Sequence, residues 1–554
     1  MACSFTLYVV GFPSLYGGAG AELYHQLILW RHMNVAVHII PTQQRVETSQ
    51  LYRQVLDLGV VIHRAWDWES IPRDAPVLSF CNEDFLTHLP AIRRRTSRTI
   101  FINCMTWLFP GEREAMLRGD ISMFLYQNGH VRQRLMPQLQ ALHDAPRVRY
   151  LCFRPYFDPS AFPFISARPS DHFCSGHISR HDADKFSRDM WHIYESFDAP
   201  VPKQGLCLGF NQISAAKTGP PPAWVRTCRD QRELSQQEFY RRCHVVLQPT
   251  DTTENWPRVG LEAMASGSVL IVNKRGGWEQ MIEHGKTGWL CEHAGDFIAC
   301  ATKMAWEPHL RQDMAAAARE RGRLLSGREA SQASWQEVFA AIDTLPESRP
   351  CRPAPSILIG ICSHAQATGR RQAIRDTWLR RLPSYCRAVF FIGGGCVPAG
   401  EEADVVALDA PDSYQELPQK IFAFLRYALS DSASRWIFKC DDDTYLHPRR
   451  LHTLIQAHAE LVGDMSVKRR GAPSGGAGYL LSRHLAERLL EQSPLPATGA
   501  EDLIIGELAR RLGARMIATP RLYHSNTTFP ARWNRQITAH WCSPDIMKTI
   551  DSIC

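Results

Sequence analysis

Three consecutive carboxylates, Asp441, Asp442 and Asp443, follow the apolar run 436–440 and are themselves followed at once by a second short apolar segment. Carboxylates at the end of a strand are hard oxygen ligands, so the arrangement suits a divalent cation and a diphosphate that the cation would bridge. Acidic triplets also occur in solvated turns. The apolar segments on both sides favour a binding site over such a turn.

A second pair of acids, Glu254 and Glu262, is separated by seven residues and follows the apolar run 245–249. Carboxylates on a loop over the edge of a sheet can accept strong hydrogen bonds from sugar and ribose hydroxyls. For Glu262 the alternative is an acid in the first turn of a helix, where the helix dipole favours it.

The two-glutamate pattern, the apolar run 269–273 after it and the glycine turn at Gly276 resemble glycosyltransferase family 4, clearly over 166–345 and loosely over 1–165. The resemblance implies a two-lobed GT-B fold, an activated sugar donor, retention of anomeric configuration and no metal. It places Glu254, as a catalytic residue, at the transferred hexose and Glu262 at the ribose.

The segment 176–186 resembles the part of that family in which an arginine and a lysine hold the diphosphate, so Arg180 and Lys185 are expected at the leaving group. His177 stands where the family commonly has the arginine. Gly18 lies in a glycine-rich turn before a helix predicted over 21–31, where backbone amides can face phosphate or sugar. A plain glycine-rich turn is the alternative there.

Four ordered segments, 370–378, the acidic triplet, 475–482 and 501–506, resemble glycosyltransferase family 31, the β1,3-galactosyl/N-acetylglucosaminyl and Fringe-like enzymes. The resemblance covers about 356–530. It implies a single nucleotide-sugar-binding α/β domain of the GT-A type, inverting transfer and a divalent metal, for which Mn²⁺ is expected.

By this second resemblance the site residues divide into metal ligands, nucleotide contacts and a base. They are Asp443 and His524 for the metal, Asp441 and Asp442 for the nucleotide and metal shell, Arg371 and Arg375 near the nucleotide, and Asp502 as the general base. The alternative for Glu501 and Asp502 is a simple helix cap.

Short apolar runs alternate with helical stretches along the whole chain, which predicts an α/β protein built on parallel sheets. We expect two Rossmann-like lobes, an acceptor lobe at 1–165 and a donor lobe at 166–345. A Pro-rich linker at 346–355 then leads to one further α/β domain at 356–554.

The formal net charge is +7 and the basic residues are dispersed, so nucleic acid is not indicated. The charge suits an anionic ligand and leaves peripheral contact with a membrane open. The start of the chain lacks a signal-like pattern and no run reaches the ~18 apolar residues of a membrane span. The 17 cysteines contain no CxxC pair. We therefore expect a cytoplasmic protein without an integral membrane segment, zinc site or disulfide framework.

Together these features predict a bifunctional glycosyltransferase that takes nucleotide-sugar donors, expected to be UDP-sugars, and glycan, glycolipid or protein acceptors. The N-terminal site would need no cofactor and the C-terminal site Mn²⁺. Two alternatives remain: one module alone is active, with the first weakened by the histidine at position 177, or the chain is a non-catalytic glycan-binding scaffold.

Overall fold

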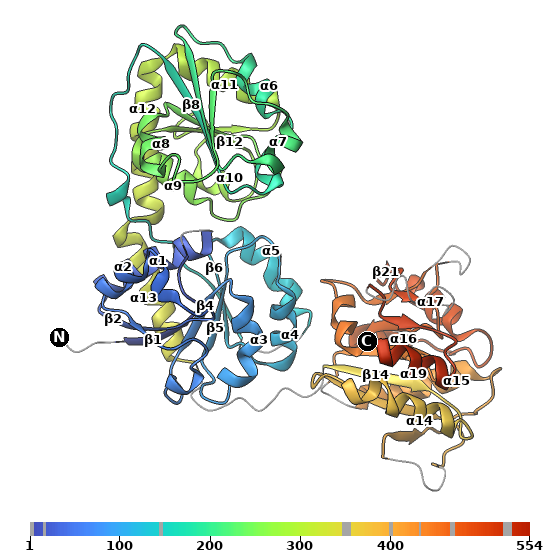
Figure 1. Ribbon diagram of the computed structural model, residues 1–554. Coiled ribbons are helices and arrows are strands. Elements are labelled where there is room, and N and C mark those ends of the chain that lie inside the picture. The colour runs from blue at the N-terminus through green and yellow to red at the C-terminus, as the bar shows by residue number, and fades with distance from the viewer. Residues whose placement is uncertain are drawn as a thin grey trace. The chain divides into compact units, whose positions relative to one another are not determined.

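The computed structural model describes residues 5–14, 18–142, 148–345, 356–397, 403–430, 434–465, 471–523 and 535–553 (Figure 1). By its contacts the chain divides into two compact units. The first consists of 1–109, 121–135 and 147–349, and the second of 110–120, 136–146 and 350–554.

The first sheet is seven-stranded and parallel, in the order β3-β2-β1-β4-β5-β6-β7. Its inner strands are continuous apolar runs because both faces are covered, as the buried pattern of β4, β5 and β6 shows. The strands are β1 (Phe5–Val10), β2 (Val35–Ile40), β3 (Val61–Ile62), β4 (Val77–Phe80), β5 (Thr99–Asn103), β6 (Met123–Tyr126) and β7 (Arg149–Cys152). The helices between them are α1 (Gly18–His32), α2 (Tyr52–Asp57), α3 (Glu83–Ile92), α4 (Pro110–Arg118) and α5 (Gly129–Gln140).

The second sheet is six-stranded and parallel, in the order β10-β9-β8-β11-β12-β13. Its strands are β8 (Phe173–Ile178), β9 (Lys203–Leu208), β10 (Val225–Cys228), β11 (Val245–Gln248), β12 (Val269–Asn273) and β13 (Trp289–Cys291). The helices are α6 (Met190–Ser196), α7 (Gln212–Thr218), α8 (Gln236–Arg242), α9 (Arg258–Ser266), α10 (Gly277–Met281), α11 (Ala294–Trp306), α12 (Pro308–Ser326) and α13 (Arg328–Asp343).

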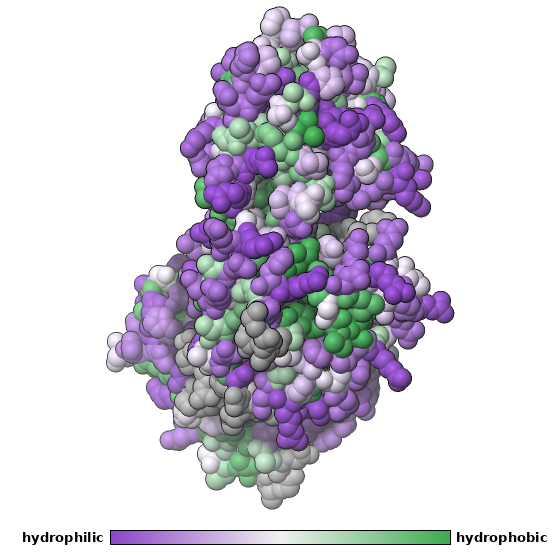
Figure 2. Space-filling model, turned by 90° about the vertical axis from the view of Figure 1, so that its left-hand side faces the viewer, coloured by the Kyte–Doolittle hydropathy of each residue, from purple (hydrophilic) through white to green (hydrophobic). Residues whose placement is uncertain are grey.

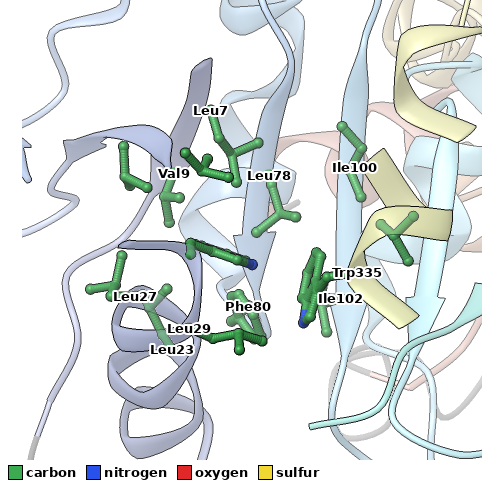
Figure 3. Close-up of a cluster of buried hydrophobic side chains, with 14 of the residues drawn as sticks. Leu7, Val9, Leu23, Leu27, Leu29, Leu78, Phe80, Ile100, Ile102 and Trp335 are labelled. Carbon is green, nitrogen blue, oxygen red and sulfur yellow. The ribbon is translucent and has the colours of Figure 1, made fainter. Parts of the chain in front are cut away.

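Helix α13 follows the second sheet in the chain but packs in the core of the first sheet. Its Trp335, Val338 and Phe339 belong to the same buried cluster as Leu7 and Leu27 (Figure 3). The Trp335 ring meets Trp30 of α1 edge to face at 4.9 Å, an arrangement that aromatic pairs favour. The last helix before the linker thus completes the first lobe.

The third sheet has the order β16-β15-β14-β17-β20-β19-β21 and is mixed, because β20 runs antiparallel to both of its neighbours. Its strands are β14 (Ile357–Cys362), β15 (Cys386–Ile392), β16 (Val405–Ala407), β17 (Trp436–Asp441), β19 (Leu461–Gly463), β20 (Tyr479–Ser482) and β21 (Met516–Ala518). A small sheet of β18 (Tyr445–Leu446), β22 (Leu522–Tyr523) and β23 (Thr538–Ala539) accompanies it. The helices are α14 (Thr368–Asp376), α15 (Leu417–Ser430), α16 (Arg483–Leu490), α17 (Glu501–Arg511) and α19 (Pro544–Ile553).

Each large sheet reverses its strand order at one place: between β1 and β4, between β8 and β11, and between β14 and β17. The loops that leave the two strands at such a point diverge, and open α/β sheets bind ligands there. The loop with Glu254 follows β11, and the acidic triplet ends β17. The fold therefore brings both predicted acid motifs to reversal points.

The predicted α/β class with Rossmann-like lobes and a further α/β domain is confirmed. Within the described residues, no helix has the length and apolarity needed to cross a membrane. Hydrophilic side chains predominate on the face drawn in Figure 2, with smaller apolar areas between them.

Candidate active sites

The first candidate site lies where β8 and β11 diverge. Lys185 ends a 3₁₀ turn after β8, and its Nζ lies 2.5 Å from Oε1 of Glu254 in the loop after β11. The backbone amide of Asp251 donates to the carbonyl of Asp184, which ties the two loops together. The Lys185 and Glu254 side chains are 14% and 23% exposed. A lysine and a carboxylate therefore share a partly open position at the reversal point of the second sheet.

Two glycines hold the Glu254 loop in place. The amide of Gly277 donates to the carbonyl of Glu254 at 2.8 Å. A Cβ on Gly277 would lie 1.9 Å from the Asn255 carbonyl oxygen, and Gly276 has a φ of +62°. Both positions therefore need glycine, for contact distance and for backbone conformation respectively.

Glu262 lies on the buried side of α9, one turn after the helix begins. Its Oε2 accepts a hydrogen bond from the Tyr240 hydroxyl of α8 at 2.8 Å. Burial raises the pKa of Glu262, and the charge of Arg258 opposes the rise. Glu262 is thus a buried acceptor that already binds a hydroxyl group.

The remaining predicted residues of this site differ in their surroundings. His177 is fully buried, its Nδ1 lies 3.0 Å from the Leu247 carbonyl, and burial lowers its pKa to about 4, so it carries no charge at neutral pH. Arg180 is exposed and pairs with Asp182 at 3.2 Å.

A Cβ on Gly18 would meet nothing within 4 Å, whereas one on Gly20 would lie 2.5 Å from the Ser14 carbonyl oxygen. Gly20 is the glycine that this turn requires sterically.

A buried ion pair that the sequence analysis missed joins the two motif segments of the first unit. Arg258 of α9 donates through Nη1 to Oε2 of Glu22 of α1 at 2.8 Å, with side chains 7% and 1% exposed. Gln26 donates to the other Glu22 oxygen and accepts from the Trp335 indole. The sequence held one signal for this ion pair: Glu22 and Arg258 are charged residues that stand among mostly uncharged neighbours in the two motifs.

We predict that Arg258→Met lowers the unfolding free energy of the first unit by about 3–5 kcal/mol, because Glu22 would stay buried without its cation. Urea unfolding followed by hydrogen exchange in α1 and α9 measures the effect. The double variant Glu22→Gln/Arg258→Met should recover most of the loss. An unchanged single variant, or a double variant as unstable as the single one, would contradict the assignment.

The second candidate site lies where β14 and β17 diverge, and its three aspartates face different partners. Asp442 is buried and accepts hydrogen bonds from the Ser363 hydroxyl at 2.7 Å and from Arg370 at 3.0 Å. Asp442 is thus held by Ser363 and Arg370, both of which follow β14 in the chain.

Asp441, Asp443 and His540 form a cluster that can hold a metal ion. One ligand atom from each lies within 4.8 Å of the other two. Nε2 of His540 is 3.0 Å from Oδ1 of Asp443, yet that buried oxygen has no aligned hydrogen bond among the described residues. Two carboxylates and an imidazole, with one buried carboxylate oxygen left without an aligned hydrogen bond, fit a divalent ion such as Mn²⁺.

The structure adds His540 to the candidate ligands, whereas His524, the predicted ligand, lies outside the described residues. The sequence offered a weak signal for His540, a histidine directly after a short apolar strand. Burial acts to raise the pKa of Asp443, but the hydrogen-bonding contact and charge of His540 and the charge of Arg370 outweigh it and lower the pKa. Asp443 is therefore ionised at neutral pH, as a ligand must be.

The arginines of α14 have three separate roles. Arg371 is fully buried and donates to Ser363 and to the carbonyls of His364 and Ala365, so it shapes the loop after β14. Arg375 forms a two-pronged ion pair with Asp404. Arg370, which the sequence analysis did not select, is half exposed and lies against Asp442, 4.0 Å from Asp443. Of the three, Arg370 is the cation beside the acidic triplet.

Asp502 begins α17 with Glu501, and the turn before β20 joins it to the metal cluster. Oδ2 of Asp502 accepts from the amide of Gly475 at 3.2 Å. A Cβ on the next residue, Gly476, would lie 2.0 Å from the His540 ring. Adjacent residues therefore contact Asp502 and His540, and the candidate base lies next to the candidate metal site.

The buried side chain of Lys439 connects the end of β17, the Gly475 turn and the start of α17. Nζ of Lys439 lies 2.7 Å from both Asp441 Oδ1 and Glu501 Oε1, and it donates to the Gly475 carbonyl. Tyr479 donates to the other Glu501 oxygen. Burial acts to lower the pKa of Lys439, but Asp441 and Glu501 raise it well above its usual value. The lysine stays charged and fixes the strand end, the glycine turn and the start of α17.

Comparison with known proteins gives two family matches in this chain. Residues 233–321 match the model of glycosyl transferases group 1, and residues 369–468 match the galactosyltransferase model. These segments include Glu254 and Glu262 in the first case and the acidic triplet in the second. Two segments of the chain therefore match two glycosyltransferase family models, as the sequence resemblances predicted.

Individual relatives cover only parts of the chain. A probable β-1,3-galactosyltransferase 13 of Arabidopsis thaliana is 31% identical over 18% of this chain and 34% of its own length. A D-inositol 3-phosphate glycosyltransferase of Pseudarthrobacter chlorophenolicus is 30% identical over 19% of this chain and 25% of its own length. The chain thus spans about a third or less of these two relatives. The solved structure of Anabaena Alr3699/HepE in complex with UDP and glucose aligns with 61% of this chain and 100% of its own, at 13% identity and a TM-score of 0.49.

Proposed function

We propose that the chain is a bifunctional glycosyltransferase with one nucleotide-sugar site in each module. The observation that carries the proposal is the juxtaposition, in the second module, of the Asp441, Asp443 and His540 cluster with Asp502 across the Gly475-Gly476 turn. A metal-ligand cluster and a carboxylate base side by side suit direct displacement at a sugar diphosphate.

In the second module a bound Mn²⁺ would supply positive charge to the leaving diphosphate. Asp441, Asp443 and His540 would hold it, and Arg370 would face the same phosphates from α14. Asp502 would accept the proton of the acceptor hydroxyl at a carboxylate oxygen while the hydroxyl oxygen attacks the anomeric carbon. Attack opposite the leaving group inverts the configuration. The names of the Arabidopsis relatives, probable β-1,3-galactosyltransferases, support a β1,3 linkage, and the proposed donor is a UDP-sugar.

In the first module the residues themselves supply the charge that the diphosphate needs. Lys185 would exchange part of its contact with Glu254 for the phosphate oxygens, an electrostatic role that involves no metal. Glu254 would then be released to face the transferred sugar, and Glu262, buried against Tyr240, would accept from the ribose. His177 is neutral, so Arg180 is the second cation available, through rotation away from Asp182.

The proposed acceptors are a glycan, a glycolipid or a protein side chain, with peripheral membrane contact if the acceptor is lipid-linked. Placing two transferases in one chain raises the local concentration of the first product at the second site. We propose a cytoplasmic location, which the cysteines support, since each one in the described residues is a free thiol.

A donor screen tests the proposal. The purified chain is incubated with a panel of nucleotide sugars in Mn²⁺ or in EDTA, and nucleotide release is compared among wild type, Glu262→Ala and Asp443→Ala. We expect one activity that needs metal and disappears in Asp443→Ala, and another that survives EDTA and disappears in Glu262→Ala. A single activity would leave one working module, and no donor binding under either condition would favour the scaffold.

A further inference from the structure

A buried cluster of three amide side chains joins the first sheet to the loop that holds Glu254. Gln127 and Asn128 directly follow β6 of the first sheet, and Asn255 follows Glu254 in the loop after β11 of the second sheet. The three side chains belong to residues that are 6%, 6% and 5% exposed, and all lie in the first unit. Burying an amide costs free energy unless it is hydrogen-bonded, so the partners of these three residues decide what the cluster does.

The side-chain amide of Asn128 is used at both of its ends. Its Oδ1 accepts a hydrogen bond from the backbone amide of Val131 at 2.8 Å and so caps the first turn of α5. This bond directs Nδ2 away from the helix, where it donates to the Asn255 carbonyl at 2.9 Å and to Oδ1 of Asn255 at 2.5 Å. Nδ2 of Asn255 donates in turn to Oε1 of Gln127 at 3.2 Å. The three side chains form an amide clasp between elements of the two sheets.

Elements of the second sheet's lobe hold the same loop at other points. The carbonyl of Asp184 accepts from the backbone amides of Asp251 and Thr252. The amide of Gly277 donates to the carbonyl of Glu254. These bonds stay within one lobe, whereas the amide clasp crosses from the first sheet to the second. The position of Glu254 therefore depends on the contact between the two lobes.

We propose that Asn128 is a positioning residue for Glu254, and that the amide clasp couples the contact between the two lobes to the reaction of the first module. The inference rests on the proposed function of that module, in which Glu254 faces the transferred hexose. Separating the lobes would break the clasp and release the loop, so Glu254 reaches its working position only when the lobes are together. Lys185 and Glu262 belong to the second lobe, so nucleotide binding does not need the clasp, whereas transfer does.

Two variants of the full chain keep the helix cap and remove the donor. Asn128→Ser retains an oxygen for the Val131 amide but is too short to reach Asn255. Asn128→Asp also retains the cap, but it places a carboxylate against the Asn255 carbonyl. Asn211→Ser and Asn211→Asp are the matched controls, because Asn211 caps α7 through its side-chain oxygen in the same way, within the second lobe.

Calorimetry with UDP in EDTA measures binding, and turnover in EDTA of the donor identified by the screen measures catalysis. We expect Asn128→Ser to lower kcat roughly 10- to 100-fold, the scale of loss from a misplaced catalytic group, while the Kd for UDP stays within about twofold of wild type. Asn128→Asp should lower kcat at least as much. Hydrogen exchange of the backbone amides in 250–257 should be about threefold faster or more in both variants, because the loop loses a tether. Both Asn211 variants should behave like wild type.

Two kinetic results would overturn the proposal. The first is a kcat within about twofold of wild type in both Asn128 variants. The second is an equal loss of kcat and of UDP affinity, which would mean that Asn128 merely supports the fold of the unit. If wild type neither binds UDP nor turns over a donor in EDTA, the proposed function of the first module fails, and the positioning role fails with it. Unchanged hydrogen exchange in 250–257 would show, whatever the function, that the clasp does not hold the loop.

Discussion

Asp502→Asn is expected to lower sugar transfer by the second module about 10²- to 10⁴-fold, the usual contribution of a general base, while binding of UDP and Mn²⁺ stays near that of wild type. The amide keeps the shape of the carboxylate but cannot take a proton from the acceptor hydroxyl. Transfer is measured as release of nucleotide from the donor identified in the screen, and binding by calorimetry.

Asp545→Asn is the matched control for Asp502→Asn, because Asp545 likewise lies in the first turn of a helix, α19. If the two acids merely stabilise helix starts, both variants should lose a little stability and neither should lose transfer. Equal activity of the two variants would remove Asp502 from the mechanism.

Lys439→Met is expected to reduce the unfolding free energy of the second unit by about 3–5 kcal/mol and to abolish its transfer activity, because Glu501 would remain buried and unpaired. Burial raises the pKa of Glu501 and the charge of Lys439 opposes that rise, so the two groups depend on each other. Urea unfolding of the second unit and donor turnover are the measurements.

The double variant Lys439→Met/Glu501→Gln separates stability from activity. It removes both buried charges, so we expect it to recover much of the lost stability. Transfer should remain low, since neither Asp441 nor the Gly475 turn would be held by the lysine. A single variant that is as stable and active as wild type would show that the network is dispensable.

Continuous apolar runs predicted several of the strands, although not β6, whose run Met123–Tyr126 is apolar and buried throughout. The run 269–273 coincides with β12, and both acid motifs were placed correctly at strand ends. β10 has no continuous apolar run to predict it, because this short strand carries the exposed Arg226. The packing of α13 into the first lobe was also not predictable, because periodicity identifies a helix and its apolar face but not the surface it will meet.

The sequence motifs predicted the candidate site residues, but they did not predict which other residues of the chain contact them. Adjacent arginines such as Arg370 and Arg371 point in directions about 100° apart on a helix, and only tertiary packing decides which one is buried. The Glu22–Arg258 pair joins residues 236 positions apart, a separation over which a local pattern carries no information. His540 reaches Asp443 through the pairing of β23 with β18, two strands of two residues each.

The central claim, that one chain holds two independent donor sites of which one needs metal, is tested most directly by the stoichiometry of UDP binding. Calorimetric titration should give two UDP per wild-type chain in Mn²⁺ and one in EDTA. Glu262→Ala should bind one UDP in Mn²⁺ and none in EDTA, and Asp443→Ala one in either condition. A stoichiometry of one that EDTA and both substitutions affect alike would mean a single site and would contradict the account.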